Sequence, residues 1–131
     1  MTGFGIRKKL HATYDEALSR VPEALKSEGF GVLTEIDIRS TFEKKLGVDF
    51  RRYKILGACN PPFAHAALQA DLEVGLTLPC NVVIYEDDDR RAVVLTVDPT
   101  KTMAGAGNSK LVELAEAVKE KLSRALAKLE E

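Results

Sequence analysis

Hydrophobic and polar residues alternate in five segments of the chain, and the segments between them have apolar residues at helical spacing. Alternation over residues 3–12, 30–38, 50–59, 79–86 and 91–97 predicts strands. In the third segment, Tyr53, Ile55 and Cys59 share one face with Gly57, and the alternate residues from Lys54 to Ala58 share the other. The charged sequence "DDDR" at 87–90 predicts a hairpin turn between the last two strands.

Capping patterns predict where two of the helices begin. Thr13 and Glu16 form a T-x-x-E capping box ahead of apolar residues at helical spacing, and Gly29 is a typical stop. Pro22 removes a backbone donor from this helix and is expected to kink or divide it. A second box at 40–43 predicts a short helix that ends near residue 47.

Two further helices follow. The segment 60–70, "NPPFAHAALQA", is entered through Asn60 and two prolines. The segment 98–109 contains glycines and is expected to be a loop. Asn108 or Ser109 then caps the last helix, whose apolar stripe consists of Leu111, Leu114, Ala115, Val118, Leu122, Ala125, Leu126 and Leu129.

The element order β-α-β-(short α)-β-α-β-β-α predicts an α+β fold. A mostly antiparallel sheet with helices packed on one face satisfies this order. The length of 131 residues corresponds to a single domain, spanning 1–131. Many Lys, Arg and Glu residues, with one Gln and no Trp, give a thermophile-like composition.

Charge and hydropathy narrow the function classes. The formal net charge of −1 argues against nucleic-acid binding, which requires a net basic surface. The chain shows neither a signal-peptide pattern nor an apolar run of membrane-spanning length, so no membrane association and a cytoplasmic location are expected. It also lacks a Ser-His-Asp order, a paired-carboxylate motif and H-E-x-x-H, so we do not expect an enzyme.

The candidate chemistry lies in two Cys-Asn pairs. The chain has only two cysteines and three asparagines, yet Cys59-Asn60 and Cys80-Asn81 are both adjacent pairs beside proline. Cys59 ends a predicted strand and Cys80 begins the next one. If these strands are antiparallel, both pairs lie at the same end of the sheet and form the rim of one ligand-binding site.

These segments also carry a family resemblance. "GVDFRRYKILGACNPPFAHAAL", "GLTLPCNVVIYE" and "GFGVLTEIDI" resemble the bacterial and archaeal family known as domain of unknown function 302. The resemblance extends from about the first strand to residue 99. It implies a β-α-β4-α layout similar to the TATA-box-binding-protein class of folds, and it implies no particular activity.

Three functional interpretations and one structural interpretation of the pairs remain open. The favoured hypothesis is a non-enzymatic domain that binds a small ligand or a metal and self-associates as a homodimer. A metal site would use Cys59, Cys80 and His65, with zinc or copper as the ion. A thiol redox protein would use Cys59 as a thiolate at a helix start and Cys80 as its resolving thiol. In the structural interpretation the cysteines are small buried hydrophobic residues and each asparagine caps a turn, Asn60 as a helix N-cap.

Overall fold

The computed structural model describes residues 3–129. Its strands are β1 (Gly5–Lys9), β2 (Gly31–Asp37), β3 (Tyr53–Cys59), β4 (Cys80–Glu86) and β5 (Ala92–Val97). Its helices are α1 (Tyr14–Ser27), α2 (Ile38–Leu46), α3 (Pro61–Ala70), a short α4 (Pro99–Thr102) and α5 (Ser109–Ala127). Two 3-10 helices, η1 (Leu72–Thr77) and η2 (Met103–Ala106), complete the fold.

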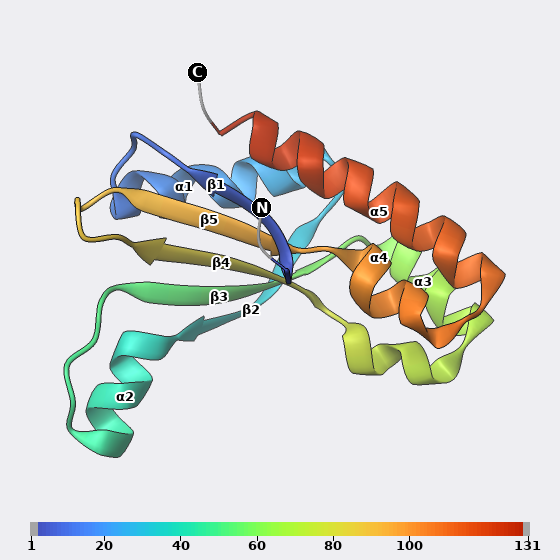
Figure 1. Ribbon diagram of the computed structural model, residues 1–131, viewed down its shortest axis with the longest axis horizontal. Helices are drawn as coiled ribbons and strands as arrows, with labels where there is room; N and C mark the ends of the chain where they lie inside the picture. Colours follow the sequence, from blue (N-terminus) through green and yellow to red (C-terminus); the bar gives the residue numbers. More distant parts are fainter. Residues whose placement is uncertain (1–2, 130–131) are drawn as a thin grey trace.

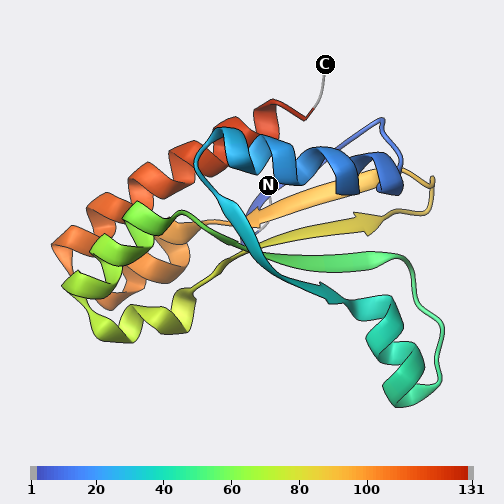
Figure 2. The ribbon, with the colours of Figure 1, turned by 180° about the vertical axis from the view of Figure 1, so that it is seen from behind.

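The strands form one antiparallel sheet (Figures 1 and 2). The strand order is β1-β5-β4-β3-β2, and every neighbouring pair is antiparallel. The α+β class, the element order and the antiparallel sheet are therefore confirmed. Strands β2 to β5 follow one another in space as they do along the chain, while β1 joins the sheet at the far side of β5. An irregularity between Val32 and Thr34 shifts the register of β2 against β3.

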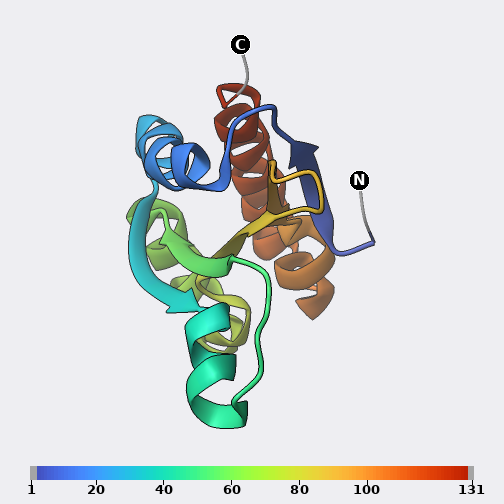
Figure 3. The same ribbon diagram turned by 90° about the vertical axis from the view of Figure 1, so that its left-hand side faces the viewer.

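The core lies between one face of the sheet and helices α1 and α5 (Figure 3). The side chains on this face include Leu56, Val82, Ile84 and Val94, each exposed by 1% or less. The predicted stripe of α5 is buried: its part from Val118 to Leu129, just beyond the helix, packs against this face, and Leu111, Leu114 and Ala115 pack in a second apolar cluster. Among residues 3–129, no helix lies over the opposite face of β3, β4 and β5.

Helix α1 begins as its sequence predicts, but it is not divided. The Thr13 hydroxyl accepts from the Glu16 amide at 3.2 Å, and the Glu16 carboxylate accepts from the Thr13 amide at 2.9 Å. Pro22 lies inside one continuous helix. Pro22 is partly exposed, so its ring does not disturb the buried side of the helix. The packing of Val21 and Leu25 in the core stabilises the helix on both sides of the proline.

The start of α2 corrects the second predicted capping box. The helix begins at Ile38, and the cap is Asp37, whose carboxylate accepts from the Ser40 amide at 2.9 Å. An aspartate three residues earlier is a good N-cap, so Ser40 lies in the first turn. The predicted stop is confirmed, because Gly47 adopts the left-handed conformation (φ 66°) that ends the helix.

The segment after β5 is more ordered than a glycine-containing loop. Asp98 caps α4 by accepting from the Thr100 amide at 3.0 Å, and η2 follows directly. Met103 is 3% exposed and packs into a second apolar cluster with α3 and α5. Asn108 is the N-cap of α5, since its side-chain oxygen accepts from the amides of residues 110 and 111. No described helix is both long and apolar enough to cross a bilayer.

Candidate functional site

The two cysteines lie at the same end of the sheet. Strand β3 ends at Cys59, β4 begins at Cys80, and Ala58 lies directly opposite Cys80 in the antiparallel register. Two prolines at the first turn of α3 direct the chain away from the sheet immediately after Asn60. A cis peptide bond joins Leu78 to Pro79 just before β4. The strand arrangement therefore brings the two segments together, as antiparallel pairing predicts.

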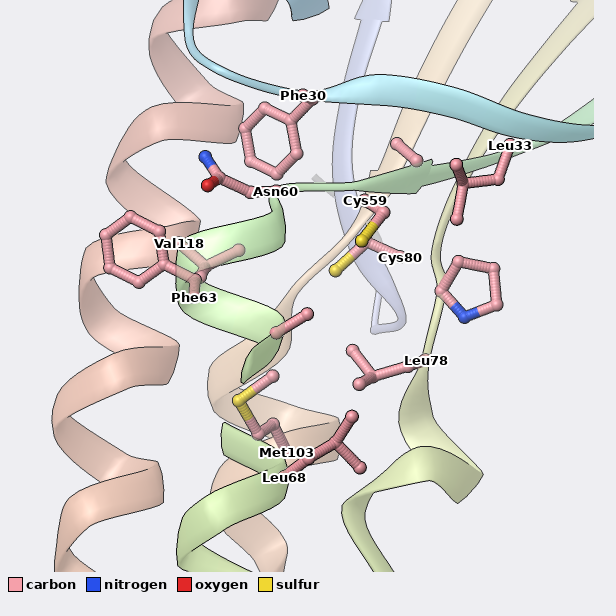
Figure 4. Close-up of a pocket in the computed structure, with 13 residues that line it drawn as sticks. Phe30, Leu33, Cys59, Asn60, Phe63, Leu68, Leu78, Cys80, Met103 and Val118 are labelled. Atoms are coloured by element: carbon pink, nitrogen blue, oxygen red, sulfur yellow. The ribbon is translucent and has the colours of Figure 1, made fainter. Parts of the chain in front are cut away.

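A pocket of about 280 Å³ opens between these segments (Figure 4). Strands β2 to β4 and the segments before them form one side, and α3, η2 and α5 form the other. The lining side chains are almost all apolar and none is charged: Phe30, Leu33, Ala58, Cys59, Asn60, Phe63, Ala64, Leu68, Leu78, Pro79, Cys80, Met103 and Val118.

Both cysteines are free thiols in this pocket. Figure 4 shows their sulfur atoms directed into the same space. Cys80 is 6% exposed, whereas Cys59 is only partly buried. Burial, with a smaller contribution from the nearby Cys59, raises the pKa of the Cys80 thiol to about 11. Cys80 is therefore a protonated thiol at neutral pH.

Asn60 occupies the N-cap position of α3 but does not cap the helix. Its side-chain nitrogen donates instead to the backbone oxygen of Glu28, at 3.2 Å, and its side chain is 7% exposed. Gly29, with φ of 89°, leaves room for this contact, because a Cβ there would lie 3.0 Å from the Asn60 nitrogen. The predicted N-cap role is wrong. Asn60 fastens the turn between α1 and β2 to the corner between β3 and α3.

Asn81 does not lie at the rim of the pocket. Successive side chains of a strand point to opposite faces, so Cys80 faces the core side and Asn81 the uncovered side. Asn81 is exposed and lines a separate hollow of about 250 Å³ with Tyr53, Val83 and Leu95. The two Cys-Asn pairs thus resemble each other in sequence but not in position: three of the four predicted ligand-binding residues share the pocket.

The predicted metal-ligand set is not assembled. His65 is exposed on α3 and does not line the pocket, because the helical rotation that turns Ala64 and Leu68 inward turns His65 away. Across residues 3–129, no group of three or more His, Cys, Asp or Glu side chains is placed to hold a metal ion.

Several residues that line the pocket could not be assigned to a binding site from the sequence. Phe63 and Leu68 follow the inner face of α3 and could have been inferred from its helical spacing, but only as core residues. Met103 comes from a segment that composition indicates to be a loop, and Phe30 and Val118 come from distant elements. Only the tertiary fold brings these side chains together.

The fold and pocket define a class: a small α+β domain with a five-stranded antiparallel sheet and an apolar pocket at one end of that sheet. Within this class, the chain belongs to the family of the domain of unknown function DUF302, whose model matches residues 6–129. The resemblance in its sequence is therefore confirmed.

A solved structure agrees with this assignment. The crystal structure of an uncharacterized conserved DUF302 protein from Bacillus stearothermophilus aligns with a TM-score of 0.90 and 29% sequence identity. The alignment covers 98% of this chain and 99% of that chain. A comparison with curated proteins gives no match.

Proposed function

We propose that the protein is a non-enzymatic binding domain that holds a small ligand in the pocket beside Cys59 and Cys80. The pocket itself is the observation that carries this proposal. Its volume of about 280 Å³ is close to the lower end of the usual range for ligand sites. A largely apolar lining with a few polar groups is also typical of such sites. Here the polar groups are the two thiols and the Asn60 amide.

The lining determines the chemical class of ligand. No charged side chain faces the pocket, so an ionic group would lose its hydration there without gaining a counter-charge. The rings of Phe30 and Phe63 and the sulfur atoms provide polarizable surface. The ligand is accordingly a small, uncharged and mostly apolar molecule, with at most a few hydrogen-bonding groups.

Thiol redox chemistry is the second candidate. It is favoured by the presence of two free thiols in one pocket. The raised pKa of Cys80 opposes it, because thiol exchange proceeds through thiolates. Zinc or copper binding has less support, since His65 is outside the pocket. A purely structural or protein-interaction domain is the interpretation that applies if the pocket binds nothing. A cytoplasmic location and the absence of nucleic-acid binding stay predictions from the sequence.

A fluorescent apolar probe tests the ligand site. The uncharged probe N-phenyl-1-naphthylamine becomes fluorescent in apolar surroundings, and Ala64→Leu extends a side chain into the pocket. We expect this substitution to weaken probe binding by at least about tenfold, a change of about 1.4 kcal/mol. His65→Leu is the matched control, because it adds the same side chain at the next, exposed position of α3.

The two variants give distinct outcomes. Weaker probe binding in Ala64→Leu alone supports the pocket as the ligand site. Equal binding by the wild type and Ala64→Leu, or equal weakening by both variants, would overturn the proposal. Circular dichroism spectra identical to that of the wild type establish that the blocked variant is folded.

A further inference from the structure

The face of the sheet opposite the core is apolar across its three central strands. The alternation of β3, β4 and β5 directs a defined set of side chains to this face, and none of them is charged: Tyr53, Ile55, Gly57, Asn81, Val83, Tyr85, Leu95 and Val97. Val93 is directed to the same face but is fully buried. An antiparallel sheet with one face in water normally carries polar side chains there. We call this surface the open face.

Helix α2 and the segment after it continue the open face beyond the sheet. A run of aromatic rings joins the two: Phe42 to Phe50 with centroids 5.1 Å apart, Phe50 to Tyr53 at 6.2 Å, and Tyr53 to Tyr85 at 5.7 Å. Figures 1 and 3 show α2 projecting away from the other helices, below the edge formed by β2. We call residues 38–50 the arm.

The arm lacks a core of its own. No residue of α2 is buried, and Leu46, Val48 and Phe50 are exposed by 66%, 46% and 39%. An isolated helix shorter than about 12 residues is marginal in water, because helix nucleation costs more than its few hydrogen bonds return. α2 has 9 residues. Its apolar side chains and its length both indicate that another surface packs against the arm.

The size of this surface is of the order of one half of a small dimer interface. The three strands β3 to β5, about 4.8 Å apart and about 20 Å long, present roughly 290 Å² in projection, and the arm adds roughly 130 Å². Accessible area exceeds projected area, so the total lies above roughly 420 Å². A standard interface takes roughly 800 Å² from each partner, and the weaker specific interfaces take less.

The chemistry of the surface favours a second copy of this chain. Homodimer interfaces are more apolar than other interfaces and are depleted of charge at their centre, as the open face is. The net charge of −1 per chain means that two copies repel each other very little. A hollow of about 250 Å³, lined by Phe4, Tyr53 and Leu95 among others, can accept a protruding side chain from the opposite copy.

We propose that two copies of the chain associate symmetrically through their open faces, with each arm packed against the sheet of the other copy. Such an isologous contact uses the same surface twice and closes at two copies. It covers the arm, the aromatic run and the apolar side chains of β3 to β5 together. Helices α1 and α5 lie on the other side of the sheet, outside the contact.

Sedimentation-velocity and light-scattering measurements on the full chain test this proposal. The wild type is expected to sediment as a dimer of twice 14.4 kDa at micromolar concentrations. Val83→Lys introduces a charge at the centre of the open face, and Phe50→Lys introduces one in the arm. Each is expected to raise the dimer dissociation constant at least about 100-fold, because a buried charge without a partner is strongly unfavourable.

Leu76→Lys is the control. Leu76 is a similar apolar residue, 92% exposed, but it lies on η1, away from the open face. A dimeric wild type, a dimeric Leu76→Lys and two folded monomeric variants would support the proposal. A monomeric wild type, a larger oligomer, or a dimer lost only in Leu76→Lys would overturn it. If Val83→Lys does not fold, Phe50→Lys decides alone, and a dimeric Phe50→Lys protein overturns the proposal.

Discussion

Replacing Asn60 by aspartate separates two roles that this residue could have in the fold. Aspartate is almost the same shape and is as good an N-cap as asparagine, so a capping residue would tolerate the change. The side-chain nitrogen of Asn60, however, donates to the Glu28 backbone oxygen at 3.2 Å, and a carboxylate cannot donate. Asn60→Asp therefore removes the contact that the structure shows and keeps the one that the sequence suggests.

The magnitude follows from burial. Leaving the Glu28 carbonyl without its donor costs about 1–3 kcal/mol. The new carboxylate is also placed where the native side chain is only 7% exposed, which adds a desolvation cost. We expect Asn60→Asp to lower the free energy of unfolding by about 2–4 kcal/mol. For a domain of this length the change corresponds to a decrease of roughly 6–16 °C in Tm.

Urea denaturation followed by circular dichroism at neutral pH measures this change. Gln69→Glu is the matched control, since it makes the same amide-to-carboxylate change at an exposed position of the same helix. It should alter the free energy of unfolding by no more than about 0.5 kcal/mol. An Asn60→Asp protein as stable as the wild type would refute the assigned contact and restore the N-cap role. The difference in free energy of unfolding between the wild type and Asn60→Asp should also become smaller in acid, where the new carboxyl group is protonated and can donate a hydrogen bond.

Three further predictions concern the thiol, the sheet and the acid limit of stability. In the Cys59→Ser variant, iodoacetamide should label Cys80 of the folded protein slowly at neutral pH and faster only as the pH approaches about 11, because burial raises the pKa of this thiol. A labelling midpoint near pH 8 would contradict this expectation. Gly57→Ala should lower the free energy of unfolding by about 1–3 kcal/mol, because its new Cβ would overlap the Thr34 hydroxyl and lie 2.7 Å from the Pro79 ring. Gly31→Ala, in the neighbouring strand with nothing within 4 Å, is the control for the same urea measurement, and equal losses would refute the steric argument. Burial raises the pKa of the Asp98 carboxyl, but hydrogen bonds from Thr100 and Lys119 outweigh this effect and hold the pKa below 3.8. The ionised carboxylate therefore stabilises the folded state above pH 3.8, and this stabilisation is lost as the pH falls through the lower pKa of the folded state. Asp98→Asn should therefore flatten the acid side of the stability curve measured by urea denaturation, and an unchanged pH profile would contradict this.

The elements of the fold could be predicted because their signals are local. Alternation identified the five strands, and the box of Thr13 and Glu16 located the start of α1. Local signals failed where two residues compete for one role. Asp37 and Ser40 are both good N-caps, and only the path of β2 into α2 decides between them. The short helix after Asp98 was missed because a single turn with glycines has the composition of a loop.

The candidate site was predictable only in part, for a similar reason. Antiparallel pairing correctly placed Cys59 near Cys80, since strand order follows from the element order. The roles of the asparagines depend on tertiary contacts. Asn60 contacts a turn 32 residues away, and the pleat of β4 turns Asn81 to the opposite face. Neither fact is encoded in the repeated Cys-Asn pair itself.

The position of β1 has a consequence for synthesis on the ribosome. β1 is made first, yet its partner in the sheet is β5, with Gly5 opposite Val97. At about 5–20 residues per second, β1 waits roughly 5–18 s before that partner has been made. Three consecutive basic residues, Arg7, Lys8 and Lys9, lie within this strand of five residues. A short strand rich in lysine pairs poorly with the strands of other nascent chains, so β1 remains available for its own sheet during the delay.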